Sequence, residues 1–338
     1  MDLNVIWFVL LGVLLAGYAV LDGFDLGVGI LHLLGRDDSE RRTFIATIGP
    51  IWDGNEVWLV TFGGALFAAF PEAYATVFSG FYVVFMLVLL ALIARAVALE
   101  FRSKTDAPAW RATWDVVFCL GSVLATLLFG AGVGNAMRGV PLDERGVYAG
   151  GFLNLLNPYA ILVGLLAVAL FAMHGSIYLH LKTAGSLQER VERWMWRTYA
   201  LFLAMYLLVT ATTLLAVPRA TGPFRTQPLA WLAVLLNVGA VLAIPYALAR
   251  RWSGRAFVAS CGAVGALVLL LGLALFPNLV TSHPGPQNSL TIYNASSSQA
   301  TLRIMLLIAA IGMPFVLAYT SIIYWVFRGR VDISQAEY

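Results

Sequence analysis

The stretch from Tyr18 to Gly64 decides the fold of this chain; it begins YAVLDGFDLGVG at residues 18–29 and ends IGPIWDGNEVWLVTFGG at residues 48–64. Both parts are apolar enough to lie in membrane helices. They nevertheless contain four carboxylates, namely Asp22, Asp25, Asp53 and Glu56. Charged side chains at membrane depth cost free energy and usually serve a function. We therefore interpret the rest of the chain around these four residues.

The composition indicates an all-α integral membrane protein. Of the 338 residues 60% are hydrophobic and 12% are charged, whereas soluble domains have about 25% charged residues. The net charge of +3 is spread along the chain without a basic patch, which excludes nucleic acid as a partner. We predict a single transmembrane domain over residues 1–338, whose first helix is retained and is not a signal peptide.

Nine stretches are long and apolar enough to cross a membrane, which takes about 20 residues. We expect two four-helix halves, formed by the first four and the next four stretches, with the ninth helix appended. The stretches are 5–34, 50–70, 75–100, 113–137, 157–181, 197–217, 229–249, 256–276 and 302–327.

The connections between the predicted stretches are alternately rich and poor in Lys and Arg. This pattern predicts the orientation of the chain in the membrane. Fifteen lie in the connections after the first, third, fifth, seventh and ninth stretches, and five lie on the opposite side. The N-terminus is therefore predicted outside and the C-terminus inside. The five are Arg138, Arg145, Arg219, Arg225 and Arg303.

The four carboxylates are predicted to lie at one depth. Asp22 and Asp25 are three residues apart and share a face of the first helix, on its cytoplasmic side. Asp53 and Glu56 occupy the first turns of the second helix, where the helix dipole favours negative charge. Either the set forms a hydrated, proton-accepting half-channel, or Asp53 and Glu56 only cap the helix and the others are structural.

Further residues belong to the same region. Arg95 lies near the cytoplasmic end of the third helix, and we expect it to pair with Asp25 or Asp53. Asp115 opens the fourth helix on the same side. The spacing of Gly23 and Gly27 lets another helix approach closely.

The four histidines do not form a metal site by their spacing. His174 and His180 are six residues apart, and no pair has the i, i+4 spacing of a helical metal site. We therefore expect no metal ligands and no catalysis of bond chemistry by this chain alone. The uncharged connection 277–299 is either a plain external loop or one that caps the bundle or docks a partner.

Several motifs resemble the second subunit of cytochrome bd-type quinol oxidases, and the resemblance spans nearly the whole chain. The first three helices carry its most specific part, and residues 183–255 add little. The motifs are YAVLDGFDLGVG at 18–29, GRDDSERR at 35–42, the run from IGPIWDGN at 48–55 to GFY at 80–82, RAVALEFRSK at 95–104, Gly134-Asn135, LLNPYAIL at 155–162 and SLTIYNASSSQATL at 289–302.

The resemblance implies a fold and a function. The family is a nine-helix bundle in a complex that oxidises quinol, reduces O2 to water and builds a proton gradient. Two haems b and one haem d belong to the first subunit. The second subunit is taken to stabilise that partner and to lead cytoplasmic protons inward. Some members hold a bound quinone in this subunit. The expected location is a bacterial or archaeal cell membrane, with membrane lipid and a small single-helix subunit as further partners.

The resemblance also assigns residues. The aspartate of the WDGN motif is Asp53, beside Trp52, and the aspartates of DGFD are Asp22 and Asp25. The arginine of the third helix is Arg95. Two alternatives remain open, which are a proton-coupled secondary transporter and a purely structural partner subunit through which no protons pass.

Overall fold

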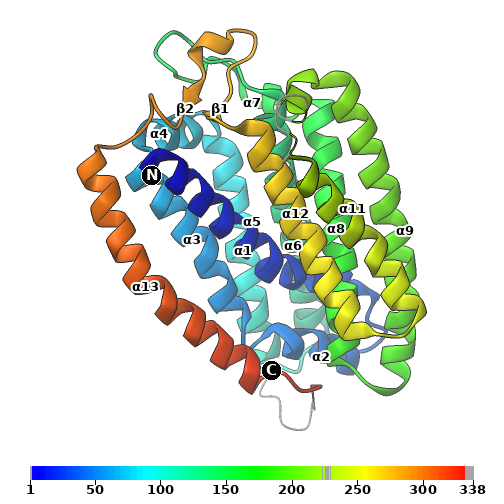
Figure 1. Ribbon diagram of the computed structural model, residues 1–338. Coiled ribbons are helices and arrows are strands. Elements are labelled where there is room, and N and C mark those ends of the chain that lie inside the picture. Colours follow the sequence, from blue (N-terminus) through cyan, green and yellow to red (C-terminus); the bar gives the residue numbers. More distant parts are fainter. Residues whose placement is uncertain (1, 223, 225–227, 229, 332–338) are drawn as a thin grey trace.

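The computed structural model describes residues 2–222, 224, 228 and 230–331 and shows a bundle of long helices (Figure 1). A two-stranded antiparallel sheet lies at one end, formed by β1 (Asn278–Val280) and β2 (Leu290–Thr291). The helices are α1 (Leu3–Leu31), α2 (Asp38–Ile48), α3 (Trp52–Ala69), α4 (Pro71–Gly80), α5 (Tyr82–Phe101), α6 (Pro108–Arg138), α7 (Phe152–Leu155), α8 (Pro158–Lys182), α9 (Gly185–Ala216), α11 (Ala230–Ala249), α12 (Ser253–Leu275) and α13 (Gln299–Val326). Short 3-10 turns are η1 (His32–Leu34), η2 (Arg102–Lys104), η3 (Pro218–Thr221) and η4 (Pro286–Asn288).

The prediction of an all-α membrane protein is confirmed. Within the described residues, eight helices are long and apolar enough to cross a membrane. These are α1 with η1, α5 with η2, α6, α8, α9, α11, α12 and α13. The 18-residue α3 packs along α1 and is the counterpart of the predicted stretch 50–70.

Two predicted boundaries are wrong for physical reasons. The stretch 75–100 is two helices, because the backbone of Phe81 leaves helical geometry between α4 and α5. The stretch 197–217 begins twelve residues too late, since the first turns of α9 are polar and escape a hydropathy criterion. The start of the stretch 229–249 falls on residue 229, which lies outside the described residues, and the remainder matches α11.

The short helix α2 was missed because it is amphipathic rather than apolar. Asp37 caps it by accepting a hydrogen bond from the backbone N–H of Glu40 at 2.9 Å. Phe44 and Ile48 are fully buried on its inner face. The helix thereby closes one end of the bundle, which we call the α2 end (Figure 1).

Helix α1 is the centre of the bundle and packs against α3, α6, α8 and α12. A Cβ atom on Gly27 would lie 1.9 Å from the carbonyl oxygen of Phe171 on α8. A Cβ atom on Gly23 would lie 2.8 Å from the ring of Phe171. The predicted close approach at Gly23 and Gly27 is confirmed, and it brings the carboxylates of α1 into the interior.

The connection 277–299 caps the opposite end of the bundle, so within this chain it is not a plain external loop. Ile292 and Ala295 are buried there. The backbone N–H of Ser297 donates to the carbonyl of Ala69 at 2.9 Å. We call this end the sheet end.

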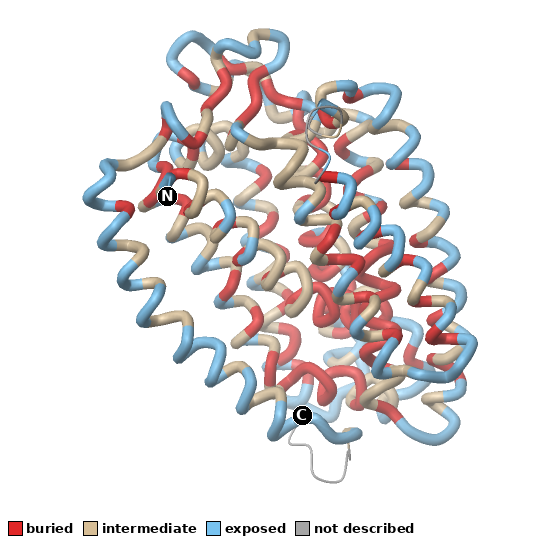
Figure 2. Tube along the Cα trace, viewed as in Figure 1, coloured by how far each residue is buried: buried red, intermediate tan, exposed pale blue. Residues whose placement is uncertain are grey.

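The described chain starts at the sheet end and finishes α13 at the α2 end (Figure 1). The connections that the sequence marks as rich in Lys and Arg meet at the α2 end, which confirms that the basic residues gather at one end. Arg225, one of the five on the other side, lies outside the described residues. Figure 2 shows burial concentrated in the bundle centre and at the α2 end, whereas α13 is exposed along most of its length.

Candidate functional site

Arg95 connects two of the four carboxylates inside the bundle. Its Nη1 donates to Oε1 of Glu56 at 2.6 Å and its Nη2 to Oδ1 of Asp22 at 3.3 Å. The side chains of Arg95 and Asp22 are fully buried, whereas that of Glu56 is 25% exposed. The predicted arginine was right but its partners were wrong, because Arg95 pairs with neither Asp25 nor Asp53. With Asp25 and Asn55, these residues form what we call the inner cluster.

Asp25 is held by an amide rather than by a cation. It is fully buried, and Nδ2 of Asn55 donates to its Oδ2 at 2.7 Å. Oδ1 of Asn55 accepts from the hydroxyl of Tyr324 at 2.9 Å. Sequence reasoning missed both neighbours. Asn55 stands in the WDGN motif and could have been suspected, but nothing in the sequence connects it with Tyr324.

Several buried polar atoms of this region have no hydrogen-bond partner among the described residues. They lie close together, since Tyr18 and Arg95 both face Asp22. Buried polar groups are almost always satisfied by protein or by ordered water. The atoms are the Tyr18 hydroxyl, Oδ2 of Asp22, Oδ1 of Asp25 and Nε of Arg95.

Asp53 lies at the solvent-facing start of α3 and is exposed. Glu56, one turn further along, is already partly enclosed. The interpretation that Glu56 only caps the helix is wrong, since its carboxylate accepts from Arg95. Trp52 is half-buried at the first position of α3.

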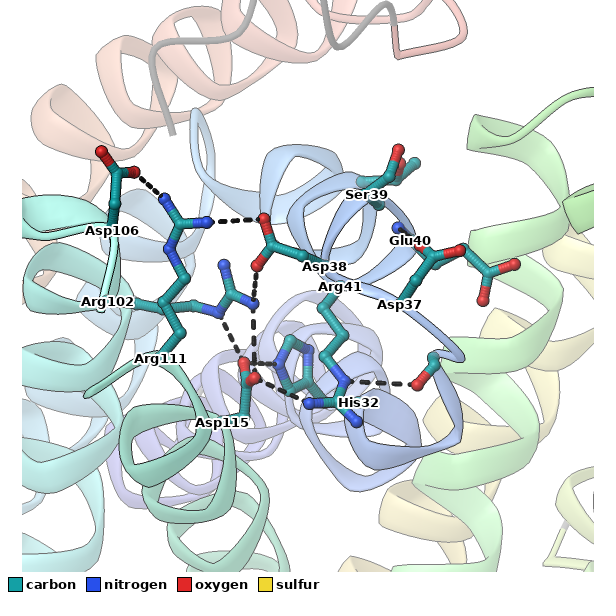
Figure 3. Close-up of polar contacts among 12 residues, drawn as sticks. His32, Asp37, Asp38, Ser39, Glu40, Arg41, Arg102, Asp106, Arg111 and Asp115 are labelled. Atoms are coloured by element: carbon teal, nitrogen blue, oxygen red, sulfur yellow. Dashed lines mark hydrogen bonds and ion pairs between the residues drawn. The ribbon is translucent and has the colours of Figure 1, made fainter. Parts of the chain in front are cut away.

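Asp115 belongs to a second cluster at the α2 end (Figure 3). Its Oδ1 is 2.6 Å from Nε2 of His32 and accepts from Nε of Arg102 at 2.5 Å. Its Oδ2 accepts from Arg41 at 3.0 Å. His32, Arg102 and Asp115 are buried. The structure thus places Asp115 apart from the inner cluster, although we had expected it beside the same path.

The second cluster ties four segments together. Arg102 and Arg111 both donate to Asp38 on α2, at 2.8 and 2.9 Å, and Arg111 also pairs with Asp106 (Figure 3). The contacts join η1, α2, η2 and α6. The geometry is that of an anchor for the helix ends.

The described histidines differ in how far their ring nitrogens are engaged. Both ring nitrogens of His174 are engaged, Nδ1 with the Ser260 hydroxyl at 2.7 Å and Nε2 with the carbonyl of Val20 at 3.0 Å. His32 is held by Asp115, and His180 lies 2.9 Å from the hydroxyl of Ser253. In the part of the chain that the structure describes, no three His, Cys, Asp or Glu side chains come together as a metal site.

Comparison with known proteins agrees with this architecture. Subunit 2 of the cytochrome bd-I ubiquinol oxidase of Escherichia coli (strain K12) is 38% identical over 366 residues, which cover 99% of this chain and 97% of that protein. Subunit 2 of the cytochrome bd ubiquinol oxidase of Bacillus subtilis (strain 168) is 36% identical over 335 residues, with 99% and 98% covered.

A solved structure of the bd oxidase from Geobacillus thermodenitrificans shares the fold, with a TM-score of 0.81 over 97% of this chain and 99% of that chain, at 18% sequence identity. The family model for cytochrome bd terminal oxidase subunit II matches residues 3–327. The chain therefore belongs to the family of cytochrome bd terminal oxidase subunit II.

Proposed function

We propose that this chain is the haem-free second subunit of a quinol:O2 oxidoreductase, and that it stabilises a haem-bearing first subunit and conducts protons toward it. The E. coli and B. subtilis relatives are named as subunits of ubiquinol oxidases. The haems b and d belong to the partner in this proposal, as the resemblance to the family implies, and His174 has both ring nitrogens hydrogen-bonded to other groups.

The observation that carries the proton role is that exposure falls stepwise from Asp53 through Glu56 to Arg95 and Asp22. Asp53 is exposed, the Glu56 side chain is 25% exposed, and Arg95 and Asp22 are fully buried. Asp25 lies on the same face of α1 as Asp22, about one turn nearer the α2 end, and is also fully buried. A proton that binds at Asp53 meets acidic groups at each following depth.

Water completes the path in this proposal. Asp22 lies beside Tyr18 and Arg95, and Oδ1 of Asp25 and Nε of Arg95 have no hydrogen-bond partner among the described residues. A buried water typically makes about three hydrogen bonds to such groups. Carboxylates in such an environment can exchange protons near neutral pH. Asp25 and Asp53 are the proposed carriers, while Glu56 and Asp22 hold Arg95 between them.

The proposed topology has nine spanning helices, with the N-terminus outside and the C-terminus inside. At 1.5 Å per residue, the 18 residues of α3 extend for about 27 Å, close to the thickness of the hydrocarbon core. An odd number of crossings also suits a bundle in which α1 starts at the sheet end and α13 finishes at the α2 end. The basic α2 end then faces the cytoplasm.

The remaining assignments of the proposal follow the family. The single transmembrane domain comprises one half of α1, α3, α5 and α6, a second half of α8, α9, α11 and α12, and α13 appended. The complex resides in a bacterial or archaeal cell membrane among lipids. A bound quinone and a small single-helix subunit stay predictions from the resemblance.

The proton role is tested with Asp53→Asn in the purified complex. We expect proton uptake during O2 reduction to slow at least tenfold while haem content is unchanged. Glu189→Gln serves as the control, because Glu189 is exposed near the same end at the start of α9. Unchanged uptake in Asp53→Asn would favour the purely structural alternative. A complex without quinol-dependent O2 uptake would argue against the oxidase role itself.

A further inference from the structure

Helix α13 is fastened to the bundle at its two ends. Along this fully described helix only Leu302 is buried. Near the sheet end, Nε1 of Trp7 donates to the carbonyl of Leu302 at 3.0 Å. Near the α2 end, the ammonium of Lys182 donates to the carbonyls of Phe327 and Gly329. An otherwise peripheral helix is thus held in one position along α1 and α3.

Tyr324, in the last turns of α13, is half-buried and points toward the inner cluster. Its ring meets that of Phe24 edge-to-face, with centroids 6.4 Å apart. Its hydroxyl lies 2.9 Å from Oδ1 of Asn55, which itself is 1% exposed. Phe24 and Asp25 are neighbours in the sequence, so Tyr324 approaches the turn of α1 that carries Asp25.

The hydrogen bonds around Asn55 fix which way its amide faces. Nδ2 donates to the carbonyl of Leu21 at 3.3 Å and to Oδ2 of Asp25 at 2.7 Å. A backbone carbonyl only accepts, so the amide NH2 must be on that side. The opposite atom, Oδ1, then accepts from Tyr324, whose hydroxyl is the donor.

We propose that Tyr324 is a positioning residue of the proton inlet, and that its hydroxyl locks Asn55 in the orientation that donates a hydrogen bond to Asp25. The inference rests on the proposed function, which makes Asp25 a proton carrier. It adds a control point on α13, the long helix appended to the two proposed halves. Tyr324 itself carries no proton in this scheme.

Loss of the Tyr324 hydroxyl is expected to shift the protonation of Asp25 in one direction. A donor to a carboxylate favours the ionised form. Without the Tyr324 hydroxyl, the buried Oδ1 of Asn55 loses its donor and the amide is held less firmly. Its hydrogen bond to Asp25 weakens, so Asp25 holds its proton to a higher pH, by about half a unit to one unit for one hydrogen bond. The charged or titratable groups that face Asp25 are Asp22 on α1, Glu56 on α3, Arg95 on α5, Tyr178 on α8 and Tyr324 on α13.

The test uses Tyr324→Phe in the intact complex. The infrared band of the protonated Asp25 carboxyl, identified by its loss in Asp25→Asn, is followed against pH. We expect its midpoint to move alkaline by about half a unit to one unit. Tyr319→Phe is the matched control, since Tyr319 lies on the same helix and is 60% exposed. A midpoint that does not move in Tyr324→Phe would overturn the inference.

A double-mutant cycle distinguishes an effect of Tyr324 that acts through Asn55 from a general disturbance of the structure. We expect Asn55→Ala to shift the midpoint at least as far as Tyr324→Phe, and Tyr324→Phe to add nothing in the Asn55→Ala background. Additive shifts would contradict an action through Asn55. If Tyr324→Phe does not assemble, the Asn55→Ala shift decides alone, and its absence overturns the inference.

A different result would contradict the proposed function, independently of the inference about Tyr324. If Asp25→Asn leaves proton uptake unchanged, Asp25 is not a carrier. The band position still reports whether Tyr324 controls the carboxyl. If instead Asp25→Asn slows uptake but the band does not respond to Tyr324, only the present inference is lost.

Discussion

Arg95 is the residue on which the stability of the inner cluster depends most. It is fully buried between Asp22 and Glu56, and Asp22 has no other cation within salt-bridge distance among the described residues. A buried ion pair contributes little net stability when compared with apolar residues, but removal of one partner leaves an uncompensated charge. The cluster therefore tolerates paired changes better than single ones.

Arg95→Met is expected to destabilise the complex by about 3–5 kcal/mol, because it leaves the buried Asp22 without its cation. The thermal unfolding midpoint of the purified complex measures the loss. The double variant with Asp22→Asn should recover part of it. Equal midpoints for Arg95→Met and the unsubstituted complex would show that the pair is not formed as described.

Asp115→Asn should also be costly, by about 3–5 kcal/mol, since Arg102 and His32 are buried around the Asp115 carboxylate. Asp106→Asn provides the control at the same end of the bundle, because the Asp106 side chain is fully exposed although it pairs with Arg111. We expect no measurable change in the unfolding midpoint for Asp106→Asn. Similar midpoints for the two variants would contradict the anchoring role of the second cluster.

At the scale of elements, the crossing of α1 and α8 places the carboxylates in the interior. The backbones touch at Gly27 and Gly175, where no side chain fits. Because the contact is between backbones, it cannot relax by rotation of a side chain. Small residues allow such close packing of membrane helices.

Gly27→Ala should therefore separate α1 from α8, since its Cβ would lie 1.9 Å from the carbonyl oxygen of Phe171. We expect destabilisation of at least about 1–3 kcal/mol, the usual range for overpacking. Gly12→Ala on the same helix is the control, as nothing lies within 4 Å of its added Cβ. That variant should be neutral or more stable by up to about 1 kcal/mol. The thermal unfolding midpoints of the two variants measure the difference. Equal midpoints for Gly27→Ala and Gly12→Ala would argue against the close crossing of α1 and α8.

The sequence predicts the long helices well because each is a local property of about 20 apolar residues. It fails at α2, where the composition is polar, and at the break before α5. The carboxylates and Arg95 could be found as charges in apolar runs. Which charge pairs with which depends on how helices rotate against each other, so the Arg95 partners were wrong. The contact of Tyr324 with Asn55 joins residues 269 positions apart and leaves no local pattern.

At the scale of the whole molecule, the proposed function assigns O2 reduction to the first subunit and the supply of protons to this chain. The described part of this chain places buried acids in the bundle interior. In the proposed function the redox centres belong to the first subunit, as the resemblance implies, and this chain provides a route for protons from its basic end.

The chain expressed alone should show no haem Soret band in its visible spectrum after purification. Within the complex, His174→Phe should leave haem content unchanged, because both nitrogens of His174 are hydrogen-bonded to other groups. Absorbance and pyridine haemochrome analysis measure both results. A Soret band at full occupancy in the isolated chain would contradict the division of labour.

In the proposed function, protons pass Asp25 on their way to the partner subunit. The most direct measurement is the rate of proton uptake by the complex during a single turnover with O2, compared between Asp25→Asn and the unsubstituted protein at equal haem content. We expect uptake to slow at least tenfold in Asp25→Asn. Uptake at the unsubstituted rate would contradict it.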